Sequence, residues 1–202
     1  MKKTISLILM ATTIVGAVIA KKGSPSDLQV QSKKVVIDKL GKVKDPLNTQ
    51  RATTADTTSL SGVDVVTNSN SGIQYATHTS TLEDGTILGF SISSSTAYFC
   101  GAISSAKSVT IPETITYNNK TYSVMYIGRY SGSNYTLDFR KATSVASLTI
   151  PSVATNIYNS IPSTISELHL LGTTPPNIYY SNINAGTTVY VPKGAYSTYQ
   201  SY

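Results

Sequence analysis

Few side chains in this 202-residue chain could carry out catalysis. His78 and His169 are its two histidines and Cys100 is its single cysteine, and the three fall in different segments. No HExxH or GxSxG motif and no group of carboxylates at metal-ligand spacing accompanies them. The isolated carboxylates of the second half are interpreted as solvated charges: Glu113, Asp138 and Glu167. The sequence therefore predicts no enzymatic activity, no cofactor and no metal site.

The sequence favours a packing role for the single cysteine over a reactive one. A single cysteine can form neither a disulfide within the chain nor a cysteine-cage metal site. Because Tyr98 and Phe99 precede it, Cys100 is predicted to be a buried thiol that packs as a small apolar side chain. The alternative, a reactive thiol, needs a neighbouring cation or a helix start to lower its pKa, and the sequence shows neither.

One short strand pattern recurs along the second half of the chain. In Ser-Leu-Thr-Ile-Pro at 147–151, two aliphatic residues flank one variable residue, which is the period of a short half-buried strand. Proline then ends strand pairing, because it has no backbone N–H to donate. Related segments are Ser-Val-Thr-Ile-Pro at 108–112, Glu-Leu-His-Leu-Leu at 167–171 and Thr-Val-Tyr-Val-Pro at 188–192.

The spacing of these segments predicts a stack. Their first aliphatic residues are 39, 20 and 21 positions apart: Val109, Leu148, Leu168 and Val189. The last two intervals fall within the roughly 20–29 residues of leucine-rich repeats, and the first is about twice that length. We therefore expect a mainly β fold: a short leucine-rich repeat solenoid whose copies form a parallel strand ladder. The stretch 128–146 receives no assigned element.

The ladder cannot supply the whole core. Its aliphatic side chains alone do not offset the conformational entropy of ordering roughly a hundred residues. Further side chains must pack under the convex side, namely much of the tyrosine set and five isoleucines: Ile115, Ile127, Ile157, Ile161 and Ile165.

Four regions follow from composition. Residues 1–20 begin with two lysines and continue as a largely apolar run, as in an export signal peptide that is later removed. Residues 21–72 are lysine-, serine- and threonine-rich and predict a flexible, disordered linker. Residues 73–107 contain two β-prone runs joined by three serines, which predict a β-hairpin cap. Residues 108–202 form the predicted solenoid, and no transmembrane span is expected after signal removal.

The formal net charge of +6 belongs mostly to the predicted linker. From residue 21 to 51 there are eight basic and three acidic residues, whereas from residue 52 onward six basic residues face seven acidic ones. A nucleic-acid-binding surface needs a basic face with interleaved aromatic residues, and the tyrosine-rich half is not basic. No nucleic-acid partner is expected. The basic run is interpreted as a solvated spacer, with attraction to an acidic cell envelope as the alternative.

The residues between the aliphatic pairs are the candidate binding row. If the aliphatic residues point inward, the variable residue of each copy points outward on the concave face of the sheet. That row is Thr110, Thr149, His169 and Tyr190. Solenoids often bind extended partners on this face, and His169 and Tyr190 offer the largest contact area. The alternative is that these are ordinary β-favouring surface residues.

Several segments resemble the BspA-like leucine-rich repeat surface proteins of Bacteroidetes. They are VTIPETITYNNKTYSV at 109–124 with Ile127 and Gly128, LTIP at 148–151 with Ile157, GTTPP at 172–176 and VYVPKGAYSTY at 189–199. The resemblance implies a repeat that closes with a strand leading into a short helix. It also implies an extracytoplasmic protein, since some members act as adhesins for host or bacterial surface proteins.

From these observations we expect an exported recognition protein at the cell surface, in the periplasm or secreted. Its predicted partner is an extracellular protein or glycan. The alternative function is a non-binding structural or accessory protein of the cell envelope, held near acidic surfaces by its basic N-terminal region.

Overall fold

The computed structural model describes residues 59–131, 134–159, 161–179 and 183–201, and the backbone of two upstream strands, β1 (Ser32–Ile37) and β2 (Val43–Lys44). The predicted signal peptide and most of the predicted linker lie outside these residues. The described part is mainly β structure, as expected, and ends in a 3-10 turn, η1 (Lys193–Ala195), followed by α1 (Tyr196–Gln200). None of its helices is long and apolar enough to cross a membrane.

The recurring segments form the centre of a six-stranded sheet. They are β8 (Ser108–Thr110), β14 (Ser147–Ile150), β16 (Glu167–Leu170) and β18 (Thr188–Pro192). Neighbours pair in parallel, with Leu148 opposite both Val109 and Leu168, and Leu168 opposite Val189. This confirms the predicted parallel pairing. The sheet as a whole is mixed, because β1 pairs antiparallel with β18 and β2 antiparallel with β1.

A second sheet faces the first and, within the described residues, contains ten strands. Antiparallel pairing joins β5 (His78–Thr81), β6 (Ile87–Ser93) and β7 (Thr96–Ile103). Parallel pairing then continues from β7 through β10 (Lys120–Ile127), β15 (Asn156–Tyr158) and β17 (Asn177–Tyr179). The other strands of this sheet are β3 (Gly62–Asp64), β4 (Val66–Thr67), β9 (Thr114–Tyr117) and β13 (Asp138–Lys141).

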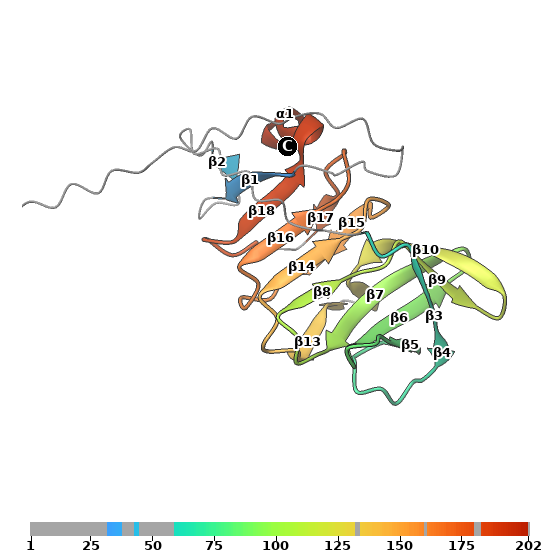
Figure 1. Ribbon diagram of the computed structural model, residues 1–202. Coiled ribbons are helices and arrows are strands. Elements are labelled where there is room, and N and C mark those ends of the chain that lie inside the picture. The colour runs from blue at the N-terminus through green and yellow to red at the C-terminus, as the bar shows by residue number, and fades with distance from the viewer. Residues whose placement is uncertain are drawn as a thin grey trace, which may run out of the picture.

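The two sheets curve around one interior in a nearly barrel-like arrangement, so the structure bears out a mainly β fold but not the predicted solenoid of parallel coils (Figure 1). The stretch 128–146, which received no element from sequence, forms the hairpin β11 (Arg129–Ser131) and β12 (Asn134–Thr136) and then β13. β13 pairs with β7 where Gly101, at φ +151, lies against the Asp138 carbonyl and leaves no room for a side chain.

Order begins earlier than the sequence predicts. β3 and β4 lie within 21–72, the stretch predicted to be a linker, and β3 pairs in parallel with β9, with Val63 opposite Ile115. The Ser59 hydroxyl also donates to the Glu113 carboxylate at 3.0 Å. The linker prediction is therefore wrong from residue 59 onward, and also at β1 and β2, which lie within the same stretch and extend the six-stranded sheet. These strands lie at the margin of the sheet and leave side chains such as Val66, 66% exposed, in solvent, so their composition resembles that of a loop.

The predicted hairpin is confirmed as β6 and β7. It does not form a separate cap, because β7 is shared between the antiparallel and parallel halves of the ten-stranded sheet. The rings of Phe90 and Phe99 meet edge to face at 5.7 Å and lie in the common core. The hairpin is therefore a continuous part of the ten-stranded sheet.

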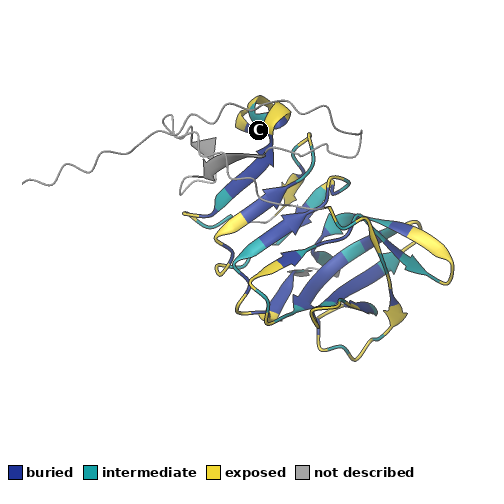
Figure 2. Ribbon diagram, viewed as in Figure 1, coloured by how far each residue is buried: buried dark blue, intermediate teal, exposed yellow. Residues whose placement is uncertain are grey.

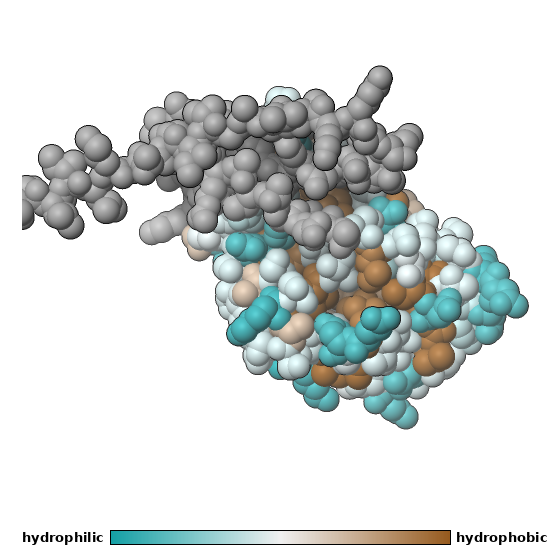
Figure 3. All heavy atoms as spheres, viewed as in Figure 1, coloured by the Kyte–Doolittle hydropathy of each residue, from teal (hydrophilic) through white to brown (hydrophobic). Residues whose placement is uncertain are grey.

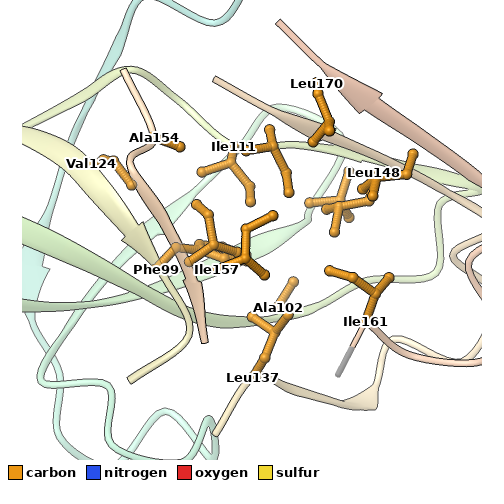
Figure 4. Packing of buried hydrophobic residues seen from close by; sticks show 14 of the residues in the cluster. Phe99, Ala102, Ile111, Val124, Leu137, Leu148, Ala154, Ile157, Ile161 and Leu170 are labelled. Atoms are coloured by element: carbon orange, nitrogen blue, oxygen red, sulfur yellow. The ribbon is translucent and has the colours of Figure 1, made fainter. Parts of the chain in front are cut away.

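Buried residues run along most strands of both sheets, and their side chains meet in one cluster (Figures 2 and 4). In the space-filling view, apolar residues also reach the surface near the middle of the described part, with hydrophilic residues toward its rim (Figure 3). The five isoleucines predicted to pack beneath the ladder are each 0–1% exposed: Ile115, Ile127, Ile157, Ile161 and Ile165. That prediction is confirmed.

Replacement of Ile157 by Ala should test the shared core. Ile157 lies in β15 and is 1% exposed, so Ile157→Ala should lower the free energy of unfolding by about 2–5 kcal/mol, through lost transfer energy and a residual cavity. Val66→Ala, at a side chain that is 66% exposed, should change it by less than about 0.5 kcal/mol. Denaturant unfolding measures both, and equal losses would contradict the placement of Ile157.

Asp138 holds the 68–77 segment against the ten-stranded sheet. Its carboxylate accepts hydrogen bonds from the Gln74 backbone N–H at 2.8 Å and from the Arg140 side chain at 2.8 and 2.9 Å. The hydrogen bonds from Arg140, together with the Gln74 N–H, lower the pKa of Asp138 to about 2 in spite of its burial. The interpretation of Asp138 as a solvated charge is wrong, since it is 5% exposed.

This carboxylate should make stability depend on pH under acidic conditions. Because the pKa of Asp138 falls from 3.8 to about 2 on folding, its contribution is complete above pH 4 and is lost as pH falls toward 2. Asp138→Asn should cost about 2 kcal/mol at neutral pH and flatten the unfolding free energy between pH 4 and 2. Glu83→Gln, at an exposed carboxylate, is the matched control. An unchanged acid profile in Asp138→Asn would contradict the role of this carboxylate.

Candidate functional site

The structure brings the four predicted row residues together on adjacent strands. Thr149 of β14 lies opposite Thr110 of β8 on one side and opposite His169 of β16 on the other. His169 in turn lies opposite Tyr190 of β18. All four alternate with core aliphatic residues, so they point away from the interior, as predicted.

The row is not open to solvent. Thr149 and His169 are 5% exposed and Tyr190 is 8% exposed, whereas Thr110 is half-buried. The expected exposure is therefore wrong for three of the four residues. Part of the burial is mutual, because the rings of His169 and Tyr190 stack at 4.4 Å and 5° and so cover each other's faces. The alternation of inward and outward residues was predictable, but this lateral packing was not.

His169 is held in its neutral form. Burial is the main cause that lowers its pKa, and it outweighs the opposing effect of Glu167, whose Oε2 lies 3.8 Å from His169 Nε2. Its Nδ1 is buried and has no hydrogen-bond partner within the described part of the chain. A buried, neutral imidazole stacked on a tyrosine is a packing element, with one nitrogen left for a further hydrogen bond.

A second aromatic row crosses the outer side of the ten-stranded sheet, and sequence reasoning did not find it. It consists of Tyr98, Tyr126, Tyr158 and Tyr179 and is called the tyrosine ladder below. Its members come one each from the strands β7, β10, β15 and β17, which are labelled in Figure 1. Ring centroids of successive members lie 4.6, 6.0 and 5.5 Å apart, with interplanar angles of 20°, 27° and 27°.

Strand register places these rings. Tyr126 lies opposite Tyr98, and Tyr158 lies opposite Tyr179. Their neighbours Phe99, Ile127 and Ile157 turn inward into the core, so the tyrosines turn outward. The tripeptide Asn-Ile-Tyr at both 156–158 and 177–179 is the sequence feature that could have revealed part of the ladder. The prediction that tyrosines fill the space under the convex side is wrong for these four residues.

A glycine allows the ladder to form between β10 and β15. Gly128 follows β10 with φ +89 and lies directly against the Tyr158 carbonyl, where any side chain would clash. Only glycine combines this backbone conformation with so close an approach. The Tyr126 and Tyr158 rings can therefore come within stacking distance across the two strands.

One cation stands at the start of the ladder. The guanidinium carbon of Arg129 lies 4.6 Å from the Tyr98 ring centroid, on a half-buried side chain. Tyr98, Tyr126 and Tyr158 are also half-buried, and Tyr179 is 44% exposed. The four ladder strands contain no carboxylate. The result is a strip of tyrosine with one arginine and no acidic residue.

The remaining candidates for chemistry lie apart. Cys100 is fully buried with Ile73 and Ala76, and burial raises the pKa of its thiol to about 12 although the Arg129 charge opposes the shift. The prediction of a buried thiol is confirmed, even though a cation not evident from sequence lies near. His78 contacts the edge of Tyr117 at 4.4 Å. No cluster of three metal-ligating side chains occurs among the described residues.

Comparisons of the chain with protein-family models, with curated proteins and with solved structures find no significant match.

The neutral state of His169 predicts a pH dependence of folding. Because its pKa is lowered below 6.5, the unfolded chain takes up the proton first, and the stability associated with the neutral ring is lost as pH falls below 6.5. His169→Phe keeps an aromatic ring beside Tyr190 but cannot titrate, so its unfolding free energy should fall less than that of wild type between pH 7 and 5. Denaturant unfolding at several pH values measures this. His78 is present in both proteins and its contribution cancels; parallel profiles would refute the prediction.

Proposed function

We propose that this chain is an exported, non-catalytic recognition protein that binds an extracellular protein or glycan in the manner of an adhesin. In this proposal it is a short leucine-rich repeat protein of the BspA-like kind, and the tyrosine ladder is its binding surface. The charged and then apolar character of residues 1–20 supports export.

Two features support the repeat class. The in-register residues Leu148, Leu168 and Val189 recur at nearly equal intervals, which lie within the roughly 20–29 residues of leucine-rich repeats. In the second sheet, Tyr158 pairs in register with Tyr179. These two tyrosines are as far apart in the sequence as Leu168 and Val189. Each coil of such a repeat contributes one strand to each sheet and buries its aliphatic side chains against the coils on either side.

The tyrosine ladder is the observation that carries the recognition role. Protein-binding surfaces are enriched in tyrosine, methionine and arginine and depleted of lysine and carboxylates at their centre. Tyrosine offers a large, rigid contact area at a low cost in conformational entropy. The ladder holds four tyrosines already fixed by stacking, with Arg129 at one end and no carboxylate on its strands.

The burial of His169 and Tyr190 favours a packing role for the concave row. It also gives some support to the alternative function, a non-binding structural or accessory protein of the envelope that is retained by its basic N-terminal region. Retention through charge weakens steeply with ionic strength, whereas a packed aromatic interface weakens less. Salt therefore separates the two functions.

Substitution within the ladder should abolish recognition without unfolding the protein. Tyr126→Leu combined with Tyr158→Leu removes two stacked rings and should weaken capture of the mature protein on an array of matrix proteins and glycans by at least tenfold, at about 0.15 M salt. Tyr117→Leu, off the ladder, is the matched control. Circular dichroism should show that both variants are folded. Capture that persists in the ladder variant, or that disappears with salt alone, would contradict the proposal.

A further inference from the structure

Stacking decides which parts of the tyrosine rings are available to a partner. The rings of Tyr98, Tyr126 and Tyr158 each have a neighbouring ladder ring within 6.0 Å at no more than 27°, so neighbouring rings cover one another's faces. The guanidinium of Arg129 lies over the Tyr98 ring, so this end of the stack is covered as well. A stack of this kind presents ring edges along its length.

Those edges have a definite electrostatic character. The quadrupole of an aromatic ring makes its face negative and its edge positive, and a phenol hydroxyl can donate a hydrogen bond. Arg129 adds a full positive charge at the Tyr98 end. Because β7, β10, β15 and β17 contain no carboxylate, nothing on these strands offsets that character. The strip is complementary to carboxylates and backbone carbonyl groups.

We propose that the tyrosine ladder binds an extended acidic polypeptide segment of a partner protein, laid across β7, β10, β15 and β17. The proposal rests on the recognition function and names the partner for the same surface. Neighbouring strands lie about 4.8 Å apart, so the four ladder strands span roughly 14 Å, the length of about four to five residues of extended chain. Carbonyl groups along that segment meet the positive ring edges, and a carboxylate meets Arg129.

Covered ring faces argue against a glycan as the occupant. A sugar ring binds an aromatic side chain by lying flat on its face, and stacking covers both faces of the Tyr126 and Tyr158 rings and one face of the Tyr179 ring. A polypeptide needs no free face, since its carbonyl groups, carboxylates and aromatic side chains can meet ring edges. The same strip therefore discriminates between the two classes of partner that the recognition function leaves open.

The test uses four defined probes with the full mature chain. A peptide of six Glu-Gly repeats is compared with a neutral peptide of six Gln-Gly repeats, and polygalacturonate with its methyl ester, by biolayer interferometry at about 0.15 M salt. We expect the acidic peptide to bind most tightly. Arg129→Gln and Tyr126→Leu should each weaken its binding by about tenfold. Lys120→Gln is the control: it also removes one positive charge, at a side chain that lies over Tyr122 and outside the ladder. This substitution should weaken binding of the acidic peptide less than twofold.

The Tyr126→Leu variant distinguishes binding by the ladder from binding by the basic residues 21–51, because the substitution changes no charge. Equal binding by wild type and Tyr126→Leu overturns the proposal. If polygalacturonate binds and depends on Tyr126 while the peptide does not bind, the acidic-peptide proposal is wrong and the recognition function stands. If neither probe class binds and the ladder variant also leaves array capture unchanged, both proposals are wrong. Arg129→Gln gives an independent answer if Tyr126→Leu does not fold.

Discussion

Register between parallel strands is the constraint on which the rest of this structure depends. Val109, Leu148, Leu168 and Val189 lie opposite one another in neighbouring strands, and parallel pairing aligns Phe99, Ile127 and Ile157 in the facing sheet. A slip by one residue would turn every one of these side chains outward. The core, the buried concave row and the tyrosine ladder therefore all follow from a single alignment.

Both aromatic rows arise from that alignment, but they differ in what they leave to solvent. In the six-stranded sheet His169 and Tyr190 are nearly parallel and almost fully buried. In the ten-stranded sheet the stacked tyrosines remain half-buried and Tyr179 is exposed. Stacking thus stabilises the first row as part of the fold, while in the second it fixes a surface strip, which would lower the entropy cost of the proposed association.

Much of the fold could be predicted because it repeats. The aliphatic pairs revealed four strands and their parallel order, and the serine-rich connection revealed the β6–β7 hairpin. The strands β3 and β4 could not be predicted, since they are short and partly exposed. The tyrosine ladder escaped because its members are unevenly spaced along the chain, so no fixed period marks them. Exposure of the concave row depends on lateral packing that no local pattern encodes.

The twin Asn-Ile-Tyr strands have a consequence for how such a protein can change. The coil that separates them has the length of the interval from Leu168 to Val189, and it adds one ring to the ladder and four buried aliphatic side chains to the core, namely Ile161, Ile165, Leu168 and Leu170. Duplicating that coil would lengthen the aromatic strip by a single step without redesigning the interior. If the aromatic strip binds a partner as proposed, gain or loss of whole coils would adjust its affinity in coarse steps, in addition to substitution of individual residues.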